Sequence, residues 1–216
     1  MLSKLPDFAA PYYRDVVAFQ EKYGLTVEGM LSIEQYLLRH QLMVEEYAEM
    51  VLAFRSDDLP EFADALGDLR YVLCGTAALL GIVIPDNDVV QSFGNKPPTM
   101  PKQEHFLYYQ GRLLHAISDV ATRFAWMVQT GPNKATGASL IHADELVSTI
   151  ARMGYIPMGA VHRAIHAANM QKLRAPSKDN KRKSQFDVIK PEGWTPPDIR
   201  GVLVDHGWPG ERGVAE

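Results

Sequence analysis

The sequence predicts an all-α protein: a helical bundle of the all-α type, with an extra helical insertion and an irregular C-terminal tail. Apolar residues recur at helical spacing in several segments, and a run without Gly or Pro over residues 33–54 is rich in helix formers. Strands do not alternate with helices, and no internal repeat occurs. A chain of 216 residues, 46% of them hydrophobic, can bury its own core, so we expect a single domain over residues 1–216.

The first part of the chain predicts three helices. Gly24 is a typical C-terminal stop for the first, and Ser32 is a suitable N-cap for the second. Asp58, with Pro60 in the first turn and Glu61 three residues on, is typical of a helix N-terminus. Because few residues separate the second helix from the third, we expect these two to be antiparallel. The predicted segments are 11–23, 33–54 and 58–81.

The rest of the chain begins with a break rich in Gly, Pro and Asn over residues 85–103. Three further helices are expected after it, over residues 104–128, 143–153 and 158–173. The tail, residues 174–216, contains Trp194 and Trp208, which indicate segments packed on the body. A short β-hairpin is expected within it, around residues 185–190.

The overall charge excludes some classes of function. Lys and Arg total 22 against 26 Asp and Glu, a net charge of −4, so no protein-wide basic field is present to hold nucleic acid. No apolar run approaches the roughly 20 residues of a membrane span, and the N-terminus lacks a signal-peptide pattern. The single cysteine, Cys74, cannot form an intrachain disulfide or a thiolate zinc cluster. We therefore expect a cytoplasmic protein with no membrane partner.

The charges are arranged in two opposite blocks. Residues 44–70 carry eight acidic and two basic residues, whereas residues 171–190 carry seven basic and two acidic residues. Such a pair of blocks is what an anionic substrate with bridging metal ions requires.

The acidic block forms a stripe on each of two predicted helices. Glu46 and Glu49 lie about 60° apart on an ideal helix, with Glu45 about 40° beyond, and Asp64 and Asp68 are one turn apart. A solvated surface is the common explanation of such stripes, but apolar residues spread almost all round both helices. Buried carboxylates that face one another would repel, and a divalent cation removes this repulsion. Oxygen-only ligands favour Mg²⁺ or Mn²⁺.

Glu61 lies in line with the second stripe, but it also suits a capping role beside Asp58.

Three other kinds of site are excluded by inspection. No acidic residue stands three before a histidine, as a di-iron bundle needs, no His-Asp pair occurs, and no Gly-Lys-Ser/Thr loop is present.

Two stretches carry a family resemblance. The segment Glu-Glu-Tyr-Ala-Glu at 45–49, followed by Asp-Ala-Leu-Gly-Asp-Leu-Arg-Tyr at 64–71, resembles the paired helices of the MazG-like all-α nucleoside triphosphate pyrophosphohydrolases, and its phage-type members are the most similar. Residues 161–173 and 188–199 are similar to the C-terminal helix and tail of that subgroup. The resemblance implies an enzyme that hydrolyses a (deoxy)nucleoside triphosphate at the α–β phosphate bond to the monophosphate and pyrophosphate.

The resemblance also implies a metal site. Glu46 and Glu49 match the family's ExxE pair, and Asp68 matches the aspartate of its ExxD pair. The glutamate expected three before Asp68 is replaced by Ala65, so Asp64 is the candidate substitute. The implied cofactors are two or more Mg²⁺ or Mn²⁺ ions, held by Glu46, Glu49, Asp64 and Asp68. Glu45 or Glu46 is the candidate catalytic carboxylate that orients the attacking water.

Three residues of the basic block are candidates for substrate binding. Asn169 and Lys172 are three apart on the predicted helix, so both can donate to phosphate oxygens, although a solvated helix end is the alternative for Lys172. Lys190 and the basic tail would close over the nucleotide, whereas Arg182 and Lys183 are equally compatible with solvated loop charges. The resemblance to phage-type members favours a purine dNTP, dGTP or dATP, as the substrate. It also implies a location in the host cytoplasm if the protein is of phage origin.

The stretch from about residue 85 to residue 155 is an insertion relative to compact family members. Its aromatic-rich helix predicts core or subunit interface, and stacking of Trp126 or Phe106 on a base is the weaker alternative. The family implies a homodimer or homotetramer. A function of another class, a non-enzymatic helical adaptor that binds nucleic acid through residues 172–190, leaves the buried acids unexplained. We therefore expect no nucleic-acid partner.

Overall fold

The structure is a computed structural model that describes residues 5–25, 32–86, 96–130 and 134–210; of residues 124–130 and 134–135 it describes only the helical backbone. In these ranges the chain forms seven helices and one pair of two-residue strands, which confirms the all-α prediction. The elements are α1 (Pro11–Lys22), α2 (Ile33–Arg55), α3 (Leu59–Leu79), α4 (Gln103–Thr130), α5 (Lys134–Met153), α6 (Met158–Asn169), β1 (Leu173–Arg174), β2 (Val188–Ile189) and α7 (Ile199–Asp205). Within the described ranges, no helix has the length and hydropathy needed to cross a membrane.

Local capping interactions fix where α2 and α3 begin. The backbone N–H of Gln35 donates to Ser32 Oγ at 3.1 Å, and the N–H of Ser32 donates to Gln35 Oε1 at 3.0 Å, so the first turn of α2 is closed by a capping box. At α3, the N–H of Glu61 donates to Asp58 Oδ1 at 3.1 Å. The predicted starts of both helices are therefore confirmed.

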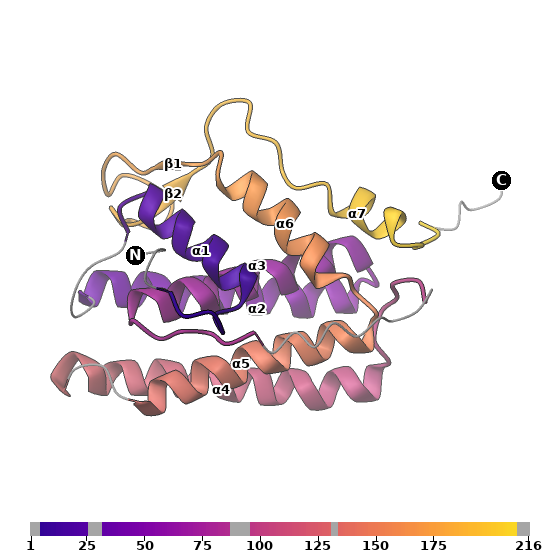
Figure 1. Cartoon of the computed structure of the whole chain (residues 1–216), viewed down its shortest axis with the longest axis horizontal. Helices are drawn as coiled ribbons and strands as arrows, with labels where there is room; N and C mark the ends of the chain where they lie inside the picture. Colours follow the sequence, from indigo (N-terminus) through magenta and orange to yellow (C-terminus); the bar gives the residue numbers. More distant parts are fainter. Residues whose placement is uncertain (1–4, 26–31, 87–95, 131–133, 211–216) are drawn as a thin grey trace.

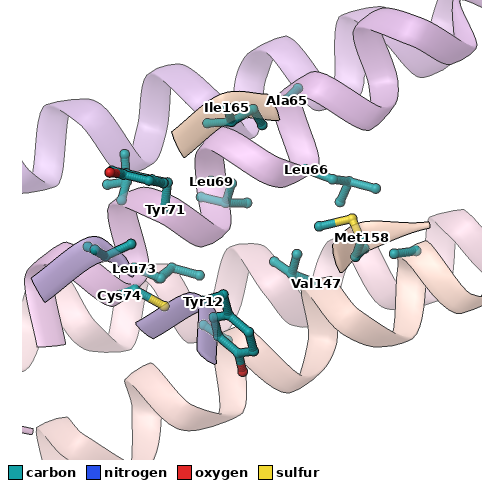
Figure 2. Close-up of a cluster of buried hydrophobic side chains, with 14 of the residues drawn as sticks. Tyr12, Ala65, Leu66, Leu69, Tyr71, Leu73, Cys74, Val147, Met158 and Ile165 are labelled. Carbon is teal, nitrogen blue, oxygen red and sulfur yellow. The ribbon is translucent and has the colours of Figure 1, made fainter. Parts of the chain in front are cut away.

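The helices form three layers (Figure 1). The α4–α5 pair lies on one side, the α2–α3 pair lies in the middle, and α1, α6 and the β1–β2 pair lie on the other side. Helix α3 contacts α1, α2, α5, α6 and α7, and most of its side chains are buried. Figure 2 shows Leu66 and Leu69 of α3 between Val147 of α5 and Ile165 of α6. The helix that carries Asp64 and Asp68 is thus the centre of the core.

A glycine sets the close approach of α6 to α3. A Cβ atom on Gly67 would lie 2.3 Å from Ile165 Cδ1 and 3.0 Å from Val161 Cγ1, so no side chain fits there without displacing its neighbours. Because Gly67 immediately precedes Asp68, this contact brings the C-terminal end of α6 to the acidic part of α3.

The predicted insertion is tied to the rest of the fold by a buried polar group. Arg70 Nε lies 3.0 Å from Asp144 Oδ1, and both side chains are only 1% exposed. Tyr12 Oη also donates to Asp144, at 2.9 Å, while the Arg70 guanidinium stacks on the Tyr12 ring. These contacts join α5 to α1 and α3.

Phe106 of α4 is buried and stacks on Phe54 of α2, with ring centroids 3.8 Å apart. The core interpretation is therefore correct for Phe106, and its alternative role in stacking on a base is wrong. The side chain of Trp126 lies outside the described residues.

Two predicted helix boundaries, the predicted hairpin and the reading of the tail need correction. Helix α5 begins at Lys134 rather than at residue 143, because Gly137 lies in the helix against Ile82, and this tertiary packing overrides its poor propensity. Helix α6 ends at Asn169 rather than at residue 173, and Leu173 belongs to β1 instead. The expected local hairpin is wrong as well, since β2 pairs with β1, with Leu173 opposite Ile189. Helix α7, capped by Asp198, was not predicted among the prolines of the tail.

Candidate active site

A cavity of about 100 Å³ opens between α1, α2, α3, the end of α6 and the tail. Four of the predicted site residues line it, namely Glu46, Asp68, Asn169 and Lys172. The acidic and basic blocks of the sequence therefore meet at one cavity. Asn169 and Lys172 do so although α6 ends between them, because the N–H of Lys172 donates to the carbonyl of Asn169 at 3.1 Å in a turn.

Burial and mutual repulsion raise the pKa values of three carboxyl groups at the site. Burial, assisted by Asp68 and Glu49, raises the pKa of Glu46 to about 9. Burial, assisted by Asp68 and Glu61, raises that of Asp64 to about 7. Burial also raises the pKa of Asp68 to about 6, although Lys172 opposes the shift. Ionising all the carboxyl groups without a cation is therefore unfavourable, because they are removed from water and repel one another. A bound cation would offset this unfavourable free energy.

The carboxylates fit a divalent cation by their chemistry. Asp64 Oδ1 is buried and has no hydrogen-bond partner in the structure, so it has an unused lone pair. The acidic side chains offer only oxygen ligands, which Mg²⁺ and Mn²⁺ prefer. In the described part of the chain, no three His, Cys, Asp or Glu side chains converge on one point as a ligand set. Mg²⁺ commonly takes one or two carboxylates and completes its shell with phosphate oxygens and water, so this arrangement suits a substrate-dependent site.

The remaining predicted residues lie around this cavity without lining it. Glu49 is exposed on α2, but its charge raises the pKa values of Glu46 and Asp68. Lys190 is exposed, and its Nζ lies 4.2 Å from the centroid of the Trp194 ring. Lys172 Nζ lies 5.7 Å from the same ring, and Trp194 Nε1 donates to the carbonyl of Ala168 at 2.9 Å. Trp194 thus holds both lysines near the end of α6, a role that the sequence did not reveal.

Arg182 is a functional candidate whose position the sequence left open. It lines the cavity, and its Nη2 donates to Glu45 Oε2 at 2.8 Å, while its Nη1 lies 3.4 Å from Asp187. Burial lowers the pKa of Arg182, but the hydrogen bonds that it donates to Glu45 and Asp187 and the charges of these two carboxylates together outweigh burial, so the pKa is raised. Glu45 is therefore held by Arg182 and Gln41, whereas Glu46 faces the cavity.

Several other residues that were not predicted for the site line the cavity, and three of them are Tyr71, Gln20 and Arg39. Tyr71 lies one turn after Asp68 on α3, and its Oη lies 3.1 Å from His166 Nδ1. Gln20 of α1 and Arg39 of α2 also line the cavity. Gln20 stands four residues after the buried Val16 and so lies on the same, apolar face of α1. A polar residue on such a face is the sequence signal that could have indicated Gln20 as a site residue.

Comparison with known proteins gives a family match over part of the chain. Residues 18–96 match the family model described as phosphoribosyl-ATP pyrophosphohydrolase, an all-α family related to the MazG-like pyrophosphohydrolases. The matched stretch contains α2 and α3 with all the predicted acidic residues. No curated protein and no solved structure matches the chain. The match covers 79 of the 216 residues, and it suggests pyrophosphohydrolase activity on a nucleotide phosphoanhydride.

Proposed function

We propose that the protein hydrolyses a (deoxy)nucleoside triphosphate between the α and β phosphates, with two or more Mg²⁺ or Mn²⁺ ions, to the monophosphate and pyrophosphate. The observation that carries the proposal is the meeting of partly buried carboxylates and a partly buried lysine at one cavity. Glu46 and Asp68 line it from α2 and α3, and Lys172 and Asn169 line it from the end of α6.

The acidic residues divide into two roles in this proposal. Glu46, Glu49, Asp64 and Asp68 would hold the ions, which supply neutralisation of phosphate charge and a lowered pKa of bound water. Glu46 is the stronger candidate for orienting the attacking water, because its carboxyl group lines the cavity. Glu45 is the weaker candidate for this role since its carboxylate is engaged by Arg182.

The basic residues bind the phosphates. Lys172 and Asn169 donate to phosphate oxygens from inside the cavity, and Lys190, beside Trp194, extends the positive charge at its edge. The Arg182 guanidinium, fixed by Glu45 and Asp187, adds a further charge to the same end. These groups face the charge that builds up on the leaving pyrophosphate.

Two substrate classes follow from different observations. The likeness to phage-type members favours a purine dNTP, dGTP or dATP. The match over residues 18–96 names a family that acts on phosphoribosyl-ATP, which makes that compound the second candidate.

The experiment is a substrate screen. The protein is incubated with each NTP, each dNTP and phosphoribosyl-ATP in the presence of Mg²⁺ or Mn²⁺, and the products are separated by ion-exchange chromatography. We expect the monophosphate and pyrophosphate in equal amounts. Stepwise release of orthophosphate, or no turnover of any nucleotide with either metal, would contradict the proposal.

The alternative of a nucleic-acid adaptor is disfavoured because two cations of the basic segment form ion pairs within the protein. Arg182 pairs with Glu45, and Lys178 pairs with Glu34, so these charges lie against acidic side chains of α2. Salt-dependent binding of DNA or RNA without hydrolysis of any nucleotide would favour the adaptor instead.

We also propose that the protein forms a homodimer or homotetramer. Large apolar side chains are exposed on α2 and α4, which lie side by side: Ile33, Leu37, Val44, Leu52, Leu107 and Leu114. Such a group is typical of an interface. Light scattering coupled to size exclusion should give a mass of two or four chains, and a monomeric mass at micromolar concentration would contradict the proposal.

A further inference from the structure

Gln20 is a buried polar side chain that the proposed hydrolysis does not use. It is 1% exposed, lines the cavity from α1, and its Oε1 atom is buried without a hydrogen-bond partner in the structure. A buried carbonyl oxygen without a donor is unfavourable, and such groups in native proteins usually have a functional reason. The unused acceptor therefore points to a ligand that brings an N–H group.

Arg39 lies beside Gln20 and is fixed as a donor. Its Nε donates to Thr76 Oγ1 at 3.0 Å, and its Nη2 donates to the carbonyl of Val72, so α3 holds the plane of the guanidinium. Among the described residues, no carboxylate forms an ion pair with it. Burial lowers the pKa of Arg39 to about 10, which still leaves it a cation at neutral pH. Since a guanidinium only donates, its remaining N–H groups need an acceptor.

Gly75 of α3 makes the space in which these two groups lie. A Cβ atom there would lie 2.8 Å from Arg39 Nη2 and 2.8 Å from Gln20 Nε2. Both polar ends therefore sit against bare backbone, next to each other. The absence of a side chain at residue 75 leaves room for the Gln20 amide and the Arg39 guanidinium to lie side by side at this end of the cavity.

The spacing along the helices separates this pair from the carboxylates by the length of a nucleoside. Arg39 precedes Glu46 by seven residues on α2, and Asp68 precedes Gly75 by seven residues on α3. The two backbone positions of each pair therefore lie about 10 Å apart along the helix axis. Leu42, Val72 and Tyr71 line the cavity between the two ends. A nucleotide whose phosphates lie at Glu46 and Lys172 thus has its base directed toward Gln20 and Arg39.

We propose that Gln20 and Arg39 recognise the hydrogen-bonding edge of the base, and that they select a carbonyl oxygen next to a ring N–H. Guanine, uracil and thymine carry this edge. The carbonyl accepts from Arg39, as guanine O6 does from arginine in DNA complexes, and the ring N–H donates to Gln20 Oε1. Adenine and cytosine carry an amino group in place of that carbonyl, and its N–H groups would face the Arg39 cation. This inference rests on the proposed hydrolysis of a nucleoside triphosphate.

The experiment compares kcat/KM for dGTP, dTTP, dATP and dCTP in the wild-type protein and in Gln20→Leu. We expect the wild type to favour dGTP or dTTP over dATP and dCTP by at least about tenfold, because an unmatched buried polar group is costly. In Gln20→Leu this ratio should fall below about threefold, mainly through a higher KM for the favoured nucleotides. Since the substitution removes an unsatisfied polar atom, the melting temperature should not fall. Gln103→Leu, an exposed position at the start of α4, is the matched control and should keep the wild-type ratio.

A second variant tests the same idea without removing a polar group. Gly75→Ala introduces a Cβ 2.8 Å from the polar ends of Gln20 and Arg39 and so displaces them, and it should also reduce the preference. If the wild type hydrolyses nucleotides without this preference, or if Gln20→Leu and Gly75→Ala both retain it, the base-recognition role is wrong while the hydrolytic function stands. If the wild type hydrolyses no nucleotide, the proposed function itself fails.

Discussion

Glu46 and Asp68 show how much a single position depends on its surroundings. On an exposed helix face these residues would be ordinary ionised carboxylates, but burial and neighbouring acidic side chains raise the pKa values of both. Lys172, whose own pKa burial lowers, is the cation that opposes this effect at Asp68. Repelling carboxylates are therefore kept together at one cavity, which is a feature of sites that bind cations rather than of stable cores.

The first prediction concerns the acidic residues. Asp68→Asn keeps the shape of the side chain but removes its charge, so we expect pyrophosphate release to fall at least about 100-fold while stability is unchanged or higher. Glu49→Gln should behave in the same way. Pyrophosphate release at saturating Mg²⁺ and far-UV circular dichroism provide the two measurements. Glu104→Gln, an exposed position on α4, is the control, and wild-type rates in Asp68→Asn would show that the site is misplaced.

At the scale of elements, two contacts of α3 decide where the site residues lie. Gly67 lets α6 approach, which brings Asn169 and Lys172 to Asp68, and Arg70 binds Asp144, which joins α5 to the core. Both residues are neighbours of Asp68 in the sequence. The central helix therefore carries the acidic residues and also holds the elements around them.

The second prediction tests the approach of α6. Gly67→Ala places a Cβ 2.3 Å from Ile165 Cδ1, so we expect a loss of about 1–3 kcal/mol in stability and a higher KM for the nucleotide. Gly111→Ala in α4 meets no atom within 4 Å and should instead stabilise by about 0.5–1 kcal/mol. Urea unfolding and steady-state kinetics measure both effects. Equal stability and equal KM in the two variants would contradict the role of Gly67.

The third prediction tests how α5 is attached. Asp144→Ala leaves the buried Arg70 cation without its carboxylate, so we expect a loss of about 3–5 kcal/mol in stability. Glu145→Ala changes the next residue, which is half exposed, and should cost less than about 0.5 kcal/mol. Chemical denaturation of both variants provides the comparison. A small effect at Asp144 would mean that the pair does not anchor the helix.

At the scale of the whole molecule, the raised pKa values link folding to pH and to metal. A carboxyl group whose pKa is higher in the folded state than in the unfolded state stays protonated up to a higher pH in the folded protein. The unfolded chain then binds fewer protons than the folded chain between the two pKa values, so stability falls as pH rises through that range. For Glu46 this range extends to about pH 9.

The fourth prediction follows from this sign. In the presence of EDTA, the melting temperature should fall between pH 7 and pH 9, and Glu46→Gln should reduce that fall because the amide does not titrate. Added Mg²⁺ should raise the melting temperature more at pH 9 than at pH 7, since the ionised carboxylates then have a partner. Scanning calorimetry or fluorescence can follow the transition. The same slope in the wild type and in Glu46→Gln would exclude Glu46 as its origin.

The sequence by itself determined the features that depend on neighbouring residues. The all-α class followed from helical periodicity, and the starts of α2 and α3 followed from the caps at Ser32 and Asp58. The spacing of the acidic residues placed them on two helix faces, because a helix repeats every 3.6 residues. Asn169 and Lys172 were candidates for phosphate binding, and both line the cavity with Glu46 and Asp68.

Only the tertiary structure decided which distant groups meet. Arg182 could have been a solvated loop charge, but the fold of the tail brings it to Glu45, 137 residues away in the sequence. The true start of α5 and the pairing of β1 with β2 likewise depend on contacts with segments far along the chain. Gln20 and Arg39 became neighbours through the bare backbone of Gly75. Periodicity and capping act over a few residues, whereas packing between helices joins residues whose separation in the sequence carries no local signal.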